Sequence, residues 1–223
     1  SLGTDGYGEL ANAEAYIALV LVFIGLSQDG AISRYYFFYG HRSLSIVLKS
    51  SLIYTLTIAS ICLIFAFYFK SLFITYVLLV TVSQSLLNVQ LSVRLCQKKA
   101  VDYIFIQFFS SIMSVGLTVL FFETLAKNYE NRLLALLIAN FLASFLSWAL
   151  LKKKNKSNHR KGHTVKGILY IVSFGFPLIL HQLSFFFKGH ADRILIHEKF
   201  SNSELGIYAL GFQIASIFTV LLL

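Results

Sequence analysis

The stretch Leu133–Leu151 reads LLALLIANFLASFLSWALL and contains no charged residue, and Lys152, Lys153 and Lys154 follow it directly. An α-helix needs about 20 predominantly apolar residues to cross the hydrocarbon core of a bilayer. The stretch therefore predicts a transmembrane helix that ends in a basic loop. Similar apolar runs recur along the whole chain, so the expected fold class is all-α, a polytopic transmembrane helix bundle.

Seven such spans are expected, at residues 10–27, 44–69, 72–95, 101–122, 133–151, 167–196 and 205–223. The 223 residues are 57% hydrophobic and only 13% charged, whereas about a quarter of the residues of a soluble domain are charged. This composition argues against a soluble enzyme. The chain begins at Ser1 without a signal peptide and stops inside an apolar run, so we expect an internal fragment of a longer protein.

Basic residues are distributed unevenly between the loops. Thirteen of the 19 follow the first, third and fifth spans, and the positive-inside rule places these loops in the cytoplasm. The net charge of +9 therefore reflects topology, and we expect no nucleic acid as a partner. Residues 152–166 are interpreted as a basic cytoplasmic linker, although a patch that binds lipid headgroups or a protein partner is an alternative.

A short motif occurs twice. Leu2-Gly3 followed by Tyr7 opens the first span, and Leu205-Gly206 followed by Tyr208 opens the seventh. Six spans lie between the two starts, so both copies have the same orientation. Parallel repeats of six spans are a known transporter layout. We therefore expect part of a transporter with two bundles, related as a parallel 6+6 repeat: residues 1–151 as an N-terminal bundle, the linker, and residues 167–223 as the truncated start of a second bundle.

The sixth span carries a polar stripe. If residues 167–196 form one helix, a spacing of three or four residues places Ser173, Pro177, His181, Ser184, Lys188 and Asp192 on one face. A helix of this length must tilt, bend or protrude, and Pro177, the only proline, offers a place to bend. One interpretation is a helix that lines a cavity for an anionic substrate, and Arg193 lies beside it. The alternative is a seam between helices.

Other spans repeat this pattern more weakly, with Gln84, Asn88 and Ser92 in the third as the clearest case. Such small polar residues also serve close helix packing. Glu14 is either a ligand of a coupling ion or a carboxylate near the interface. The sequence contains no phosphate-binding loop, metal-ligand spacing or catalytic motif, so we expect no cofactor, no metal site and no enzymatic activity.

The segments Gly175-Phe176-Pro177-Leu178, Asp192-Arg193 and Leu205-Gly206-Ile207-Tyr208 resemble, in this order, the bacterial polysaccharide and O-antigen repeat-unit flippases of the multidrug/oligosaccharidyl-lipid/polysaccharide exporter superfamily. Leu2-Gly3 with Tyr7-Gly8 looks like the segment after that family's first helix. The resemblance covers the whole chain and implies helices two to eight of a dozen or more, so the N-terminal bundle would lack its first helix.

This resemblance implies export of undecaprenyl-diphosphate-linked oligosaccharides across the bacterial inner membrane for surface polysaccharide and lipopolysaccharide synthesis. The expected partners are the lipid-linked substrate, membrane lipids and the polysaccharide polymerase machinery. Arg34 and Arg193 could receive the diphosphate in turn, since arginine suits phosphate. The candidate cavity residues are Arg34, Gln84, Asn88, Pro177, His181, Lys188, Asp192 and Arg193. Alternatives are a cation-coupled multidrug exporter of the same superfamily and a membrane-embedded glycan polymerase or ligase.

Overall fold

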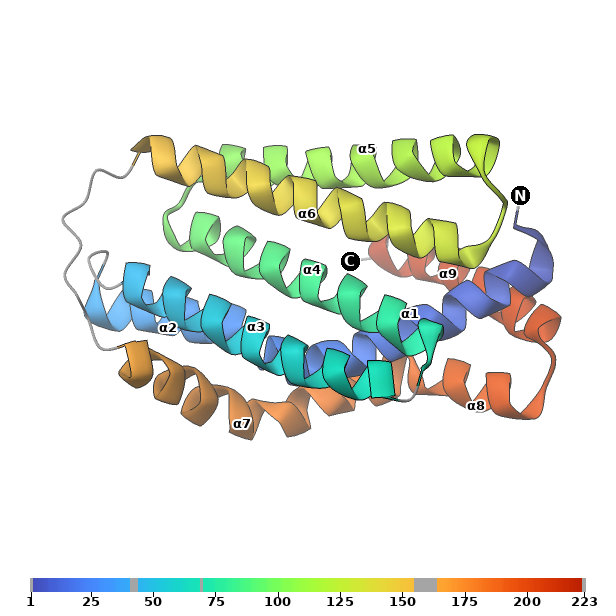
Figure 1. Ribbon diagram of the computed structural model, residues 1–223, viewed down its shortest axis with the longest axis horizontal. Coiled ribbons are helices and arrows are strands. Elements are labelled where there is room, and N and C mark those ends of the chain that lie inside the picture. The colour runs from blue at the N-terminus through green and yellow to red at the C-terminus, as the bar shows by residue number, and fades with distance from the viewer. Residues whose placement is uncertain (1, 41–43, 69, 155–163, 222–223) are drawn as a thin grey trace.

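The computed structural model describes residues 2–40, 44–68, 70–154 and 164–221. Within these residues the chain forms helices joined by short turns, and no strand (Figure 1). The helices are α1 (Gly3–Gly25), α2 (Gln28–Tyr39), α3 (Leu44–Tyr68), α4 (Leu72–Cys96), α5 (Ala100–Thr124), α6 (Tyr129–Lys154), α7 (Thr164–Gly189), α8 (Ala191–Lys199) and α9 (Asn202–Leu221).

The long helices lie side by side along the long axis of the molecule, which gives it two ends (Figure 1). We call the end at Tyr39, Leu44 and Cys96 the inner end, because the basic residues predict that it is cytoplasmic. The opposite end, where α1, α4 and α6 begin and α8 lies, is the outer end.

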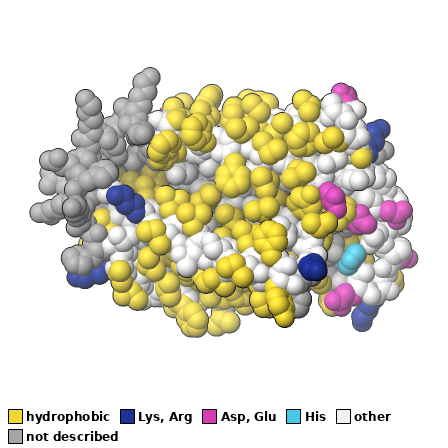
Figure 2. Space-filling model, in the orientation of Figure 1, with side chains coloured by type: hydrophobic (Ala, Val, Ile, Leu, Met, Phe, Trp, Pro, Cys, Tyr) yellow, Lys and Arg dark blue, Asp and Glu magenta, His cyan; other side chains and the backbone are white. Residues whose placement is uncertain are grey.

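Six segments of the described chain are long and apolar enough to cross a membrane: α1 together with α2, and each of α3 to α7. The seventh expected span corresponds to α9, which is not among these six. Apolar side chains of α5, such as Val101, Phe108 and Val119, are exposed, as lipid contact requires. Figure 2 shows hydrophobic side chains over the middle of the molecule and most charged ones toward its ends. The protein is therefore an all-α, multi-pass membrane protein.

Two expected helix boundaries are wrong. The first span does not end in a loop at Ser27, because the chain continues as α2, so Asp29 and Arg34 are helical residues. The sixth span is not one helix to Ile196: α7 ends at Gly189 and α8 begins at Ala191. Asp192 therefore lies on a different helix from the rest of the polar stripe. Pro177 lies inside α7 without ending it.

The linker is only partly visible. Residues 152–154 extend α6 and residues 164–166 begin α7, while residues 155–163, including Lys156, Arg160 and Lys161, lie outside the described part of the chain. The division into two bundles remains a prediction.

Two glycines permit a close crossing of α1 and α9. A Cβ atom on Gly8 of α1 would lie 2.0 Å from the carbonyl oxygen of Asn202, and one on Gly206 of α9 would lie 2.1 Å from the carbonyl oxygen of Thr4. Gly8 thus contacts the residue four positions before Gly206, and Gly206 contacts the residue four positions before Gly8. The two helices therefore make equivalent contacts with each other. Small residues at such positions let helix backbones approach closely.

Two arginines join neighbouring helices. Arg94 of α4 is fully buried, and its Nη2 donates to the carbonyl oxygen of Ser147 on α6 at 2.5 Å, while its Nη1 lies 3.8 Å from the carboxylate of Asp102 on α5. Arg132 of α6 donates to the carbonyl oxygen and hydroxyl of Ser114 on α5 at 3.2 and 2.9 Å. Both residues were counted above as loop charges, and the structure shows that they also hold α4, α5 and α6 together.

Candidate functional site

The break between α1 and α2 lies near the middle of the bundle. Leu26 and Ser27 have φ angles of 42° and 47°, a left-handed conformation that non-glycine residues rarely adopt. Gln28 bonds to the carbonyl oxygen of Ile24 and to the hydroxyl of Thr55, each at 3.0 Å, and Thr55 is near the middle of α3. The side chains around the break therefore hold it in place, as a strained backbone requires.

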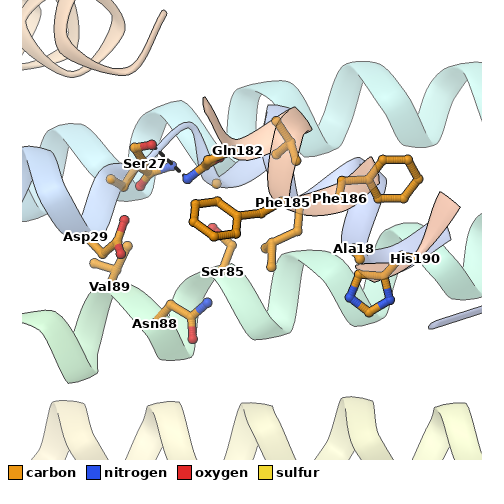
Figure 3. A pocket seen from close by; sticks show the side chains of 14 residues that line it. Ala18, Ser27, Asp29, Ser85, Asn88, Val89, Gln182, Phe185, Phe186 and His190 are labelled. Carbon is orange, nitrogen blue, oxygen red and sulfur yellow. Dashed lines mark hydrogen bonds between the residues drawn. The ribbon is translucent and has the colours of Figure 1, made fainter. Parts of the chain in front are cut away.

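Helix α7 is pressed against this break. A Cβ atom on Gly175 would lie 2.3 Å from the carbonyl oxygen of Leu26, so only glycine allows the approach. About two turns further along, Gln182 donates a hydrogen bond of 2.7 Å to the hydroxyl of Ser27 (Figure 3). Interrupted backbone within a membrane is tolerated where protein or a cavity satisfies it.

A cavity of about 280 Å³ lies beside the break, between α1, α2, α4 and α7. Figure 3 shows Asp29, Ser85 and Asn88 on one side of it and Gln182 and Phe185 opposite. Polar and ionisable groups inside membrane segments are costly, and they commonly mark a substrate or ion pathway. This cavity contains polar side chains and the ionisable side chain of Asp29 beside a broken helix. Several transporters form their binding sites in this way.

Two further cavities continue from the first, and we call the three together the cavity row. Toward the inner end a cavity of about 360 Å³ shares Asp29 and Asn88 with the first and is also lined by Ser92 of α4. Toward the outer end a cavity of about 230 Å³ shares His190 and contains Glu14 and Arg193. Polar groups thus line much of the length of the bundle.

The outer cavity is built around Arg193. Its side chain is nearly buried, its Nη1 lies 3.5 Å from the carboxylate of Glu14, and its guanidinium stacks 5.5 Å from the ring centre of Phe212. The Nε atom of Arg193 has no hydrogen-bond partner among the described residues. The crossing of α1 and α9 brings these groups together, and hydrogen bonds from Tyr7 to Gln213 and from Tyr208 to Asp192 add to it. An anion could bind Arg193 in this cavity if it displaced the carboxylate of Glu14.

Arg34 lies near the inner end of the bundle. It is exposed, and its guanidinium lies 5.5 Å from the ring centre of Phe38 and 5.4 Å from that of Phe174 on α7. Two of the neighbouring tyrosines, Tyr35 and Tyr170, are in edge contact, with ring centres 4.9 Å apart. The guanidinium of Arg34 thus lies against two aromatic rings and forms no salt bridge with a carboxylate of the described residues.

Two of the eight predicted site residues, Asn88 and Arg193, line the cavity row. Asp192 precedes Arg193 in α8 and accepts a hydrogen bond from Tyr208, but it does not line these cavities. Gln84 is not among the residues that line these three cavities. The remaining three are all exposed on α7, on the face that turns away from the described helices: Pro177, His181 and Lys188.

Sequence reasoning missed Asp29, Gln182 and His190. Asp29 was assigned to a cytoplasmic loop because it lies between the expected spans 10–27 and 44–69. The available signal was the aromatic run Tyr35-Tyr36-Phe37-Phe38-Tyr39 that follows it, which α2 contains. Among the described residues no group of three or more His, Cys, Asp or Glu could hold a metal ion.

Comparison with known proteins gives two kinds of match. A family model described as "Polysaccharide biosynthesis protein" matches residues 2–223. "Lsg locus putative protein 1" of Haemophilus influenzae is 43% identical over 98% of this chain and 55% of its own length. An "Uncharacterized membrane protein" of the same organism is 42% identical over 100% of this chain and 55% of its own length. The chain thus spans about half the length of these relatives. No solved structure matches it.

Proposed function

The chain belongs to the polysaccharide biosynthesis protein family, and from this premise we propose that it is part of a flippase for lipid-linked oligosaccharides. The proposed substrate is an oligosaccharide repeat unit on undecaprenyl diphosphate, of the kind used for O-antigen and lipopolysaccharide. The proposed direction is from the cytoplasmic to the periplasmic leaflet of the bacterial inner membrane. The activity is transport, and we assign no catalytic step to this chain.

The observation that carries the proposal is the cavity row, with one arginine near each end of the bundle. A sugar head and a diphosphate cannot cross hydrocarbon unprotected, because a bare anion in low dielectric is heavily penalised. In the middle of the bundle Asn88 and Gln182 can donate hydrogen bonds to the headgroup, and Asp29 can accept them from sugar hydroxyls. The polar path thus has the chemistry that a hydroxyl-rich, anionic headgroup requires.

The two arginines suit a diphosphate because a guanidinium can bind phosphate oxygens in pairs and keeps its charge. On this proposal Arg34 receives the headgroup at the inner end, where its present neighbours are the rings of Phe38 and Phe174. Arg193 receives it nearer the outer end, where the phosphate competes with the carboxylate of Glu14. The exposed stripe on α7 would then face the rest of the second bundle, and polysaccharide polymerase machinery would take the product.

A second candidate is a cation-coupled multidrug exporter of the same superfamily. The observation that favours it is that two carboxylates, Asp29 and Glu14, line the cavity row. Such an exporter needs acidic groups that bind a proton or a metal cation within the spans. It does not need an arginine that stays free to bind phosphate, so the arginine variants separate the two functions.

The test replaces Arg34 and Arg193 by alanine in the full-length protein, in cells that lack the native copy. Both variants are expected to abolish surface polysaccharide at unchanged protein level in the membrane, and lysine at either position is expected to restore it only in part. Lys70→Ala is the matched control, because Lys70 is an exposed cation in the turn after α3. Normal surface polysaccharide in both alanine variants would reject the flippase, and loss of drug resistance instead would support the exporter.

A further inference from the structure

A fourth cavity lies at the outer end, outside the cavity row. It has a volume of about 290 Å³ and is lined by residues of α1, α4, α6 and α8. Its lining consists of Glu9, Asn12, Tyr16, Phe73, Tyr129 and His197. On α1, the residues that line it lie on the opposite side from Tyr7, Ala11 and Glu14, which line the cavity of Arg193. We call it the outer pocket.

Two polar atoms at the outer pocket lack partners. Asn12 is 5% exposed, and its side-chain oxygen has no hydrogen-bond partner among the described residues. The Nδ1 atom of His197 is also buried and without a partner there. Buried polar groups are almost always hydrogen-bonded, and leaving one unpaired costs about 1–3 kcal/mol. Two residues of the lining therefore carry hydrogen-bonding atoms that the described part of the protein does not satisfy.

The rest of the lining is aromatic. The rings of Tyr16 and Phe73 meet edge to face, with centres 5.6 Å apart, so their positions are fixed by each other. Tyr129, the first residue of α6, adds a third ring. A pocket with rigid aromatic walls and a few polar groups is typical of sites for small organic ligands. Aromatic faces suit the C–H groups of a sugar ring, and amide, imidazole and carboxylate groups suit its hydroxyls.

The negative charge of the outer pocket disfavours the diphosphate part of the proposed substrate. Glu9 is the acidic group of the pocket, and Glu130 follows Tyr129 directly in the sequence. The pocket contains no lysine or arginine among its lining residues. Acidic side chains are also prominent at the outer end in Figure 2. A diphosphate would be repelled here, whereas an uncharged, hydroxyl-rich group would not.

We propose that the outer pocket is a saccharide subsite, which binds one uncharged sugar residue of the transported glycan on the outer side. This proposal rests on the proposed flippase function and adds a place where the sugar, separate from the diphosphate, is recognised. Asn12 acts as the central hydrogen-bonding residue, His197 and Glu9 bind further hydroxyls, and Tyr16, Phe73 and Tyr129 form the walls.

The binding test uses the full-length protein in detergent and saturation-transfer NMR with free glucose, galactose, N-acetylglucosamine and N-acetylgalactosamine. At least one sugar is expected to bind saturably, and Asn12→Leu is expected to weaken it at least tenfold. Gln107→Leu is the matched control, because Gln107 is an exposed amide on α5 outside every described cavity. His197→Phe gives a second test should Asn12→Leu fail to fold. Absence of binding by all four sugars, equal binding by Asn12→Leu and Gln107→Leu, or displacement of the sugar by inorganic pyrophosphate would overturn the subsite.

A second measurement separates this proposal from the flippase function. Surface polysaccharide is expected to fall severalfold in Asn12→Leu cells and to vanish in Arg193→Ala cells. Normal export by both Arg34→Ala and Arg193→Ala cells would reject the flippase whatever the sugars do. Failed export by Arg193→Ala together with normal export by Asn12→Leu would leave the flippase standing and reject the subsite.

Discussion

Gly8→Ala is expected to destabilise the protein by loosening the crossing of α1 and α9. The new Cβ atom would lie 2.0 Å from the carbonyl oxygen of Asn202 and 2.8 Å from its carbonyl carbon, where real Cβ atoms stay beyond 3.0 Å. The obstacle is backbone, so the helices must separate by about 1 Å or deform. Overpacking of this kind typically costs about 1–3 kcal/mol. For a chain of about 200 residues this cost corresponds to a melting temperature lower by about 2–12 °C.

The assay is thermal unfolding of the full-length protein in detergent, with gel filtration to confirm a single species. Gly116→Ala is the control, because nothing lies within 4 Å of a Cβ atom at Gly116 on α5. Gly206→Ala should behave like Gly8→Ala, since its Cβ atom would lie 2.1 Å from the carbonyl oxygen of Thr4. The double variant should lose less than the sum, because both changes separate the same pair of helices. Equal melting temperatures for Gly8→Ala and Gly116→Ala would refute the reasoning.

Three further predictions concern charges. Glu14→Gln should tighten the binding of inorganic pyrophosphate by the full-length protein about fivefold, since a partly exposed ion pair with Arg193 is worth about 1 kcal/mol; unchanged affinity in calorimetry would contradict this. Arg94→Ala should destabilise the protein by about 3 kcal/mol, because it removes a fully buried side chain with its hydrogen bond to Ser147 and leaves the carboxylate of Asp102 without its cation; thermal unfolding would measure this. Hydrogen bonds from Ser201 lower the pKa of the Glu204 carboxyl. The start of α9 should therefore be more stable above the usual pKa of glutamate, and it should lose this stability as the pH falls below about 4. Hydrogen exchange would detect the change, and Glu204→Gln should remove its dependence on pH.

The sequence predicted the fold class because lipid imposes a simple rule on it. Each span must be apolar over about 20 residues, and each must satisfy its own backbone hydrogen bonds, so helices are required. Leu133–Leu151 and its counterparts follow this rule, and the structure contains helices there. The rule says nothing about where a helix is interrupted. For that reason both wrong boundaries, at Ser27 and at Gly189, fall at breaks within a span.

The candidate site was harder to predict for the same reason. The break at Leu26 and Ser27 is held by residues far away in the sequence, namely Thr55 and Gln182, and no local pattern announces such partners. Asp29 lines the cavity because the chain forms a second helix, α2, directly after the break. Arg193 could be singled out from the sequence. Its ion pair with Glu14 could not be predicted, because it depends on the crossing of α1 and α9.

At the two ends of the proposed path, the diphosphate must displace different groups from the arginine that binds it. At Arg34 the phosphate displaces only the faces of aromatic rings, which hold an exposed cation by about 0.5–1 kcal/mol each. At Arg193 it must displace a carboxylate as well as a ring. Glu14 therefore weakens binding near the outer end and can re-occupy Arg193 when the phosphate leaves, which favours release there. Unequal affinities alone cannot drive net transport, since a ligand shifts an equilibrium only by its differential binding. Net transport needs a lower substrate concentration on the outer side, which removal of the product would maintain, or else an energy source. Glu14 is a candidate for coupling to such a source, because a proton or metal cation that neutralises it would free Arg193 for the substrate.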